Sequence, residues 1–114
     1  MTTQDPAERD ALLQGTLDLL ILRTLRPGEL HGWGISKRVR ALSNDVLQIS
    51  QGSLYPALYR LEDRKLIEAS WGISAEGRKA KFYRITDLGR EALSQERASW
   101  RAFAGAIEAV LKGT

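Results

Sequence analysis

The chain has 114 residues, of which 43% are hydrophobic and 27% are charged, and 17 Lys and Arg against 14 Asp and Glu leave a formal net charge of +3. A chain of this length is expected to form one domain that buries roughly two thirds of its unfolded surface. It contains no cysteine and a single histidine, His31. A Cys/His zinc cluster, a disulfide framework and a thiol nucleophile are therefore excluded, and we expect no metal and no cofactor.

The sequence also argues against a membrane protein. Its most apolar stretch, residues 17–25, is interrupted by Asp18 and Arg23 and is far shorter than the run of about 20 apolar residues that spans a bilayer. The first residues lack the basic and then apolar order of a signal peptide. We expect a cytoplasmic protein without a membrane partner.

Charge is distributed unevenly along the chain. Residues 1–30 carry three basic and five acidic side chains, residues 31–90 carry eleven and six, and residues 91–114 carry three of each. A basic middle between neutral or acidic ends predicts a central surface that faces a polyanion. An evenly solvated surface with accidental clustering is the alternative.

The first predicted helix begins at Asp5 and Pro6, which suit its N-cap and first position, and ends before Pro27. Apolar side chains recur in it at helical spacing, and two more lie outside that stripe. The main stripe is Leu12, Leu13, Leu17, Leu20, Ile21 and Leu25, and the additions are Leu19 and Leu22. A stripe this wide needs more than one covering surface, which a small monomer would struggle to provide.

Two further helices are predicted in the basic middle. In residues 33–42, apolar side chains at Ile35, Val39 and Leu42 fall on one face. After a polar turn, Ser50 or Ser53 can cap a third helix, whose buried face consists of leucines four and then three residues apart. These are Leu54, Leu58 and Leu61, and the opposite face carries Ser53, Pro56, Tyr59, Arg60 and Asp63, with Arg64 beside them.

Two short strands, residues 67–71 and 82–85, follow, because the first alternates apolar with polar residues and the second is aromatic and branched. Residues 72–81 between them contain two glycines together with Arg78, Lys79 and Lys81. This composition is typical of a flexible, basic hairpin tip.

Thr86 can cap a last helix that runs to about Leu111. In it, apolar residues repeat at intervals of seven with others between them, as in a coiled-coil seam: Leu93, Trp100 and Ile107, with Phe103 and Val110 between. A helix of this length is a rod on the order of 37 Å, longer than the body that precedes it could cover. A second chain is the expected cover.

Three helices, a hairpin with a basic tip and a final helix are the element order of a winged helix-turn-helix. The residues resemble the PadR-type bacterial transcriptional regulators along nearly the whole chain. The resemblance rests on residues 15–22 (GTLDLLIL), 30–35 (LHGWGI), 52–62 (GSLYPALYRLE) and 78–86 (RKAKFYRIT) followed by Leu88 and Gly89. Trp33 departs from the tyrosine that the family more often has. The single helix after the wing is similar to the family's smaller subgroup.

The fold class that we expect is mainly α with a small β-hairpin, a winged helix-turn-helix with N- and C-terminal dimerisation helices. Residues 1–114 are predicted to form a single domain. Within it, residues 30–86 are the expected DNA-reading body, and residues 1–29 and 87–114 are the expected dimerisation helices.

DNA contacts are expected from the exposed face of the third helix, which enters the major groove, and from the wing, which reaches the backbone. The candidates are Lys37, Ser53, Tyr55, Pro56, Tyr59, Arg60, Arg64, Arg78, Lys79 and Lys81. Tyr55 lies at the edge of the buried face, so core packing and phosphate contact are equally open for it. For Lys37 and the basic wing tip the alternative is simple solvation, and His31 is interpreted as a structural loop residue.

The candidate dimer contacts are the apolar residues of the two terminal helices: Leu17, Leu20, Ile21, Leu93, Trp100, Phe103, Ile107 and Val110. Trp100 on this seam is either a packed interface residue or, as the resemblance implies, part of a cavity between subunits. Such a cavity would take a small planar hydrophobic effector.

The sequence therefore predicts a homodimeric regulator, most simply a repressor, that binds a pseudo-palindromic operator in double-stranded DNA. An enzyme has no supporting constellation, since no serine or acid is paired with a base at readable spacing. The alternatives are a winged-helix module that docks a protein partner and an architectural DNA binder that needs no effector.

Overall fold

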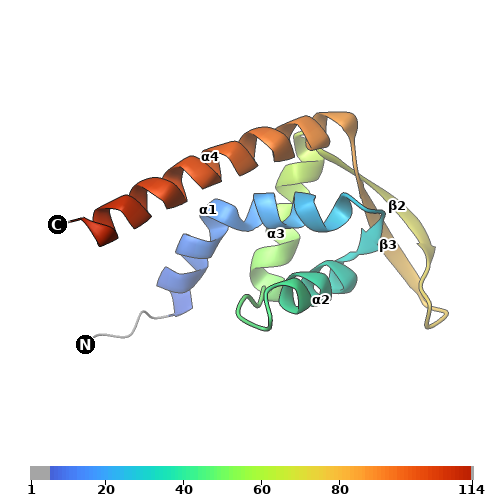
Figure 1. The fold of residues 1–114 in the computed structure, drawn as a ribbon. Helices are drawn as coiled ribbons and strands as arrows, with labels where there is room; N and C mark the ends of the chain where they lie inside the picture. The colour runs from blue at the N-terminus through green and yellow to red at the C-terminus, as the bar shows by residue number, and fades with distance from the viewer. Residues whose placement is uncertain (1–5, 114) are drawn as a thin grey trace.

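A computed structural model describes the backbone of residues 6–113 and the side chains of residues 16–113. The predicted order of three helices, a hairpin and a long last helix is confirmed, and the structure adds one short strand (Figure 1). The elements are α1 (Pro6–Leu25), β1 (Leu30–His31), α2 (Gly32–Leu42), α3 (Gln51–Asp63), β2 (Ile67–Ile73), β3 (Lys79–Ile85) and α4 (Asp87–Lys112).

The three strands form an antiparallel sheet in the order β1-β3-β2. The hairpin of β2 and β3, called the wing below, is paired along its full length, from Ile67 opposite Ile85 to Ile73 opposite Lys79. On the other side of β3, β1 pairs through Leu30 opposite Tyr83. A strand of two residues has no periodicity to read, which is why the sequence did not indicate it.

The tip of the wing is shorter than predicted, because both strands extend into residues 72–81. The Ser74 N–H donates to the Arg78 carbonyl at 2.8 Å, and the Gly77 N–H donates to the Ser74 carbonyl at 2.9 Å. Gly77 has a φ of 78°, a left-handed conformation that glycine adopts without strain. Lys79 and Lys81 therefore lie on a paired strand and not on a flexible tip.

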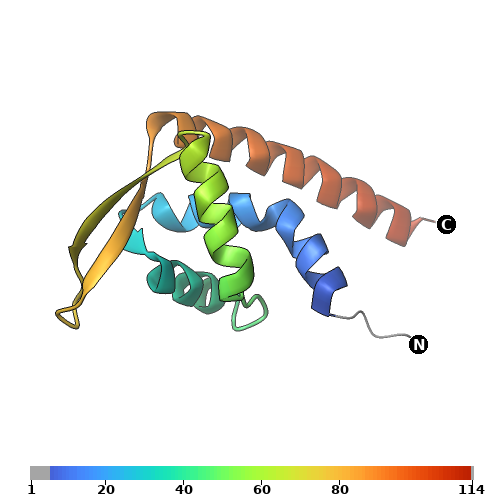
Figure 2. The ribbon, with the colours of Figure 1, turned by 180° about the vertical axis from the view of Figure 1, so that it is seen from behind.

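One hydrophobic core joins α1, α2, α3, the base of the wing and the start of α4. In Figure 2, α3 crosses in front of α1, and α4 runs along the top. The largest fully buried side chains are Leu17, Ile21, Leu22, Leu25, Ile35, Leu54, Leu58, Leu61 and Ile67. Helix α2 contributes less than predicted, because Leu42 is 59% exposed.

Three of the predicted dimer contacts belong to this core, so their assignment to a dimer surface is corrected. Leu17, Ile21 and Leu93 are only 1%, 0% and 5% exposed within the single chain. The residues around them come from α2, α3, the wing and α4, which together cover the faces of α1 that we had assigned in part to a second chain. Asp5, Leu12 and Leu13 lie outside the described side chains.

Capping residues fix the starts of three helices. His31 Nδ1 accepts the Gly34 N–H at 3.0 Å and so caps α2, which confirms its structural role. Ser50, rather than Ser53, caps α3 by accepting the Ser53 N–H at 3.2 Å. Thr86 caps α4 as predicted, by accepting the Gly89 N–H at 3.0 Å.

Helix α4 extends beyond the rest of the molecule (Figure 1). From Ser94 to Gly113 the structure shows no buried side chain. Large apolar residues lie exposed along this part, and we call them the apolar stripe of α4: Trp100, Phe103, Ile107, Val110 and Leu111. None of the described helices combines the length and the apolar character that crossing a bilayer requires.

Candidate nucleic-acid interface

Helix α3 presents a short outward face near its N-terminus. Leu54, Ala57, Leu58 and Leu61 are buried, so the side chains between them point away from the core. Tyr59 is 73% exposed, and Pro56 beside it is also exposed. Ser53 is half-buried, and its hydroxyl is hydrogen-bonded to that of Ser50 at 3.1 Å. The outward face is therefore aromatic and polar, which suits contact with the floor of a DNA groove.

Arg60 and Arg64 lie at one edge of α3 and turn towards α1. Arg60 Nη2 is 3.2 Å from Asp18 Oδ1, and Arg64 Nη1 is 3.7 Å from Asp18 Oδ2. One carboxylate thus balances part of the charge of both guanidinium groups. A contact between Arg60 and a DNA base would require this ion pair to open. The exposed Tyr59 side chain could contact a base without such a change.

The wing has an inner face that starts in the core and ends in solvent. Side chains alternate across a strand, so Trp71 shares a face with the buried Ile67, and Lys79 and Lys81 share that face on the neighbouring strand. Lys79 Nζ is 5.3 Å from the centre of the Trp71 ring. Lys81 Nζ is 5.8 Å from the ring of Tyr83 and 3.7 Å from Glu62 Oε1. Aromatic rings and ammonium groups therefore alternate along this face.

A groove of about 900 Å³ separates the inner face of the wing from the starts of α2 and α3. We call it the wing groove. Its polar and aromatic lining comes from the wing, from the starts of α2 and α3 and from the end of β1: His31, Trp33, Tyr55, Trp71, Ser74, Glu76, Arg78, Lys79, Lys81 and Tyr83.

Tyr55 both packs against Gly32 and lines the wing groove. Its side chain is 48% exposed. A Cβ built on Gly32 would lie 2.8 Å from the Tyr55 hydroxyl, so the absence of a side chain at Gly32 makes room for it. Burial, and then the charge of Glu62 and the nearby Tyr55, raise the pKa of the Tyr83 hydroxyl, so this group stays neutral at physiological pH.

The structure brings some of the sequence candidates together and separates others. Tyr55, Arg78, Lys79 and Lys81 line one groove. Lys37 lies next to it, because its Nζ is 4.9 Å from the ring of Trp33, which lines the groove. Arg60 and Arg64, by contrast, turn towards Asp18 of α1.

The comparisons with known proteins bear directly on this geometry. The family model described as "Transcriptional regulator PadR-like family" matches residues 21–95. The chain belongs to this PadR-like family. Members of the family are DNA-binding transcriptional regulators and not enzymes.

Relatives and solved structures agree with the family match. A protein from Lysinibacillus sphaericus is 34% identical over 105 residues, which are 92% of this chain and 96% of that protein. A PadR-like transcriptional regulator from Bacillus cereus has 33% identity and a TM-score of 0.77, with 91% of this chain and 99% of the other covered. A transcriptional regulator from Clostridium thermocellum has 28% identity and a TM-score of 0.81, with 90% and 99% covered.

Sequence reasoning missed two tryptophans of this PadR-like chain as candidate site residues. Trp33 and Trp71 are 59% and 65% exposed, and both line the wing groove. A signal for Trp71 was present, since strand alternation places it on the same face as Ala69, at the outer end of a strand whose base is buried. For Trp33 the helical spacing gave no comparable signal.

Proposed function

We propose that this PadR-like regulator is a homodimeric repressor that binds a pseudo-palindromic DNA operator through α3 and the wing of each protomer. The observation that carries the proposal is the wing groove, where Tyr55 of α3 lies alongside Arg78, Lys79 and Lys81 of the wing. A helix that enters the major groove and a basic wing that follows the adjacent backbone need this arrangement. Repression would follow from occupation of the operator.

The two elements are assigned different tasks. Tyr59 and Pro56 are exposed on α3 and are proposed to meet base edges, with Ser53 at the helix start. The wing cations, together with Lys37, are proposed to meet phosphates, which attract any sequence equally. Arg60 and Arg64 remain candidates for DNA contact, in which case their ion pairs with Asp18 would be replaced by contacts with DNA.

Two substitutions test this division of tasks. Lys79→Gln is expected to weaken binding to operator and random duplex about equally and to lower the salt slope by about one, because one phosphate contact is lost. Tyr59→Ala is expected to weaken operator binding alone, by about 1–3 kcal/mol, or roughly five- to 150-fold. Fluorescence anisotropy at several salt concentrations measures both, on a duplex that the parent selects from genomic fragments.

Lys112→Gln, at the far end of α4, is the matched control for loss of one charge, and it should bind both duplexes as the parent does. If Lys79→Gln and Tyr59→Ala also bind both duplexes as the parent does, α3 and the wing are not the DNA surface. A parent that binds all duplexes equally would favour the architectural alternative. A parent that binds none would favour the protein-docking module.

The homodimer is proposed from the apolar stripe of α4. Trp100 and Ile107 are 44% and 43% exposed and Val110 is 79% exposed in one protomer, on a helix segment with no other cover among the described residues. Most helical stability in proteins comes from packing of an apolar face, so a facing helix is expected to cover the stripe. Leu20, which is half-buried on α1, stays a candidate at the edge of this contact.

The effector proposal concerns Trp100. Its ring lies 6.1 Å from that of Phe103, and a hollow of about 260 Å³ follows along Phe103, Ile107 and Val110. In a symmetric dimer two such rings can stack a small planar hydrophobic compound. The compound would release DNA only if it favoured one arrangement of the protomers.

Fluorescence tests this site in the variant Trp33→Phe/Trp71→Phe, which keeps Trp100 as its single tryptophan. We expect a planar aromatic compound to quench its emission and to lower operator affinity at the same concentrations. The matched variant Trp100→Phe, with the other two tryptophans in place, should show no such quenching. Unchanged emission across a broad panel of compounds would make Trp100 a packed interface residue.

A further inference from the structure

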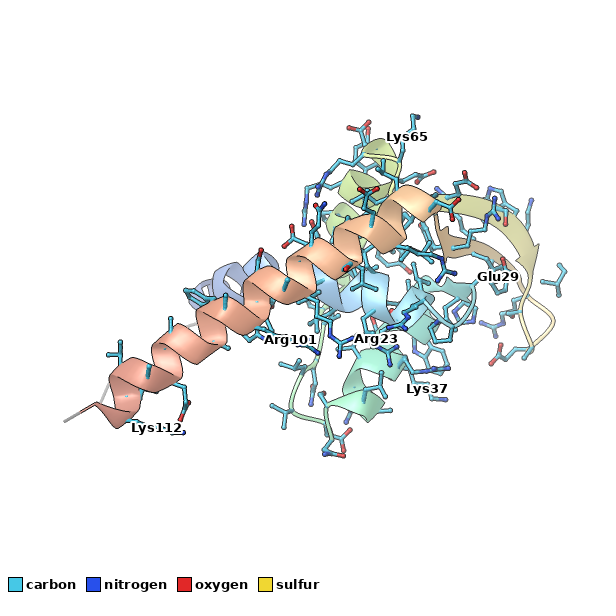
Figure 3. All side chains as sticks on the ribbon, turned by 45° about the horizontal axis from the view of Figure 1, so that its top comes forward. Arg23, Glu29, Lys37, Lys65, Arg101 and Lys112 are labelled. Carbon is cyan, nitrogen blue, oxygen red and sulfur yellow. The ribbon has the colours of Figure 1, made fainter. Side chains whose placement is uncertain are left out.

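Four arginines line one groove on the side of the molecule where α1 ends and α4 begins. Arg26 follows α1, and Arg90, Arg97 and Arg101 project from α4 into the same space of about 440 Å³. We call this the arginine groove. In Figure 3 the labelled Arg101 lies beneath α4, in the same region of the view as the labelled Arg23.

The spacing along α4 explains why three of these arginine side chains line the same groove. Positions 90, 97 and 101 are seven and then four residues apart, which places them on one face of a helix, with Ser94 between them. This face differs from the apolar stripe of α4. Leu93 and Ala98 complete the lining, so the groove has a small apolar floor under its charged rim.

Among residues 16–113, no carboxylate lies within ion-pair distance of the four guanidinium groups. Ion pairs within 4.0 Å are made in this protomer by Arg40, Arg60, Arg64 and Arg84, and by Lys81. Within residues 16–113, neither Arg26 nor the three arginines of α4 is in such a pair. No Asp or Glu among those residues lines the groove.

Several like charges that share one groove repel each other, and a bound anion removes that repulsion. A guanidinium group offers a planar fork of N–H donors that fits the oxygens of a phosphate in a bidentate manner. We propose that the arginine groove binds a multiply charged, phosphate-bearing anion. Its volume suits a ligand the size of a short polyphosphate or a nucleotide, and Ser94 adds a hydroxyl for hydrogen bonding.

This site is separate from the candidate DNA interface, since none of its lining residues belongs to α2, α3 or the wing. The anion would bridge α4 to the segment that joins α1 to β1. It would thereby bias the angle at which α4 leaves the body of the protomer. A consequent change in operator affinity rests on the proposed function, because α4 sets the spacing of two recognition helices only in the proposed dimer.

Isothermal titration calorimetry of the full chain in 150 mM NaCl, with tripolyphosphate in one arm and ATP in the other, tests binding without DNA. The variant Arg97→Gln/Arg101→Gln is expected to bind tripolyphosphate at least tenfold more weakly than the parent. Its control is Arg38→Gln/Lys112→Gln, which loses the same charge outside the groove and should stay within twofold of the parent. Equal affinities for tripolyphosphate and ATP would show that the groove recognises only the phosphates. Tighter binding of ATP would show that the nucleoside contributes to the affinity.

The single variant Arg26→Gln, in a loop, keeps the test decisive if the double variant folds poorly, and it should also weaken binding. Equal weakening in the control would mean that only diffuse charge attracts the anion, and it would overturn the proposal. Absence of binding by the parent would overturn it too. If Arg97→Gln/Arg101→Gln then raised the dimer dissociation constant, carboxylates of a second copy would be the partners instead. Because the titration contains no DNA, failure of operator binding would leave its result intact.

Discussion

Ile107→Glu is expected to convert the protein from a dimer to a monomer and to abolish tight operator binding. Ile107 lies in the middle of the apolar stripe of α4, with Phe103 and Val110 one turn away on either side. In a dimer, each introduced carboxylate would be enclosed by apolar side chains of the facing helix. An uncompensated charge in such surroundings costs roughly 3–5 kcal/mol.

The dimer dissociation constant is expected to rise at least about ten-thousandfold, since the dimer carries two such carboxylates and each 1.4 kcal/mol corresponds to a factor of ten. Operator affinity should fall at least a hundredfold, because a monomer engages one half-site and forfeits the gain from two linked contacts. Analytical ultracentrifugation and anisotropy with the same duplex measure the two effects. Binding to a single half-site should change little, since Ile107 is far along the helix from the wing and α3.

Ala102→Glu is the matched control, because it adds the same charge to the exposed opposite side of α4. It should remain dimeric and bind the operator as the parent does. If both variants are dimers, the apolar stripe does not form the interface. If both are monomers, the helix responds to added charge in general and the stripe has no special role.

The fold was largely readable from the sequence, and the reasons are local. The spacing of Leu54, Leu58 and Leu61 marks the buried side of α3, and the predicted cap and length of α4 agree with the structure. The exposed stripe of α4 follows from the same periodicity. Each of these features depends on residues within one helix, so a pattern of a few turns suffices to predict it.

The partners of α1 could not be predicted in this way. Its wide stripe called for more than one covering surface, but periodicity does not say whether the cover is another element of the same chain or a second copy. In the structure Leu17 and Ile21 are covered within the single chain, so the proposed dimer contacts shift towards α4.

The candidate interface shows the same limit. The helical spacing places Arg60 on the outward face of α3, yet its side chain is paired with Asp18, 42 positions earlier in the chain. Trp71 was interpreted as an ordinary strand residue, yet it lines the wing groove beside Lys79 on the inner face of the wing. The ion pair of Arg60 joins distant segments, and a single sequence carries no local signal for such a contact, whereas strand alternation did indicate the face on which Trp71 lies.

Gly89→Ala is expected to destabilise the protein by about 3 kcal/mol, a large effect for the addition of one methyl group. A Cβ at this position would lie 2.0 Å from the Leu66 carbonyl oxygen and 2.8 Å from Ile85 Cγ1. Moving the Leu66 carbonyl away from the added methyl group would break a hydrogen bond, because its oxygen accepts the Thr86 N–H at 3.0 Å. The Thr86 hydroxyl is also held, since it donates to the Lys65 carbonyl at 2.7 Å.

Gly105→Ala, on the same helix, separates this steric effect from helix propensity. A Cβ there meets nothing within 4 Å in the protomer, so alanine should stabilise α4 by up to about 1 kcal/mol. Urea denaturation of both variants gives the free energies of unfolding. If the two substitutions shift the midpoint in the same direction, the contact between Gly89 and Leu66 does not hold the start of α4 against the wing. If Gly89→Ala instead folds with α4 displaced, its dimer should prefer a different half-site spacing, because the same contact sets the direction in which α4 leaves the body.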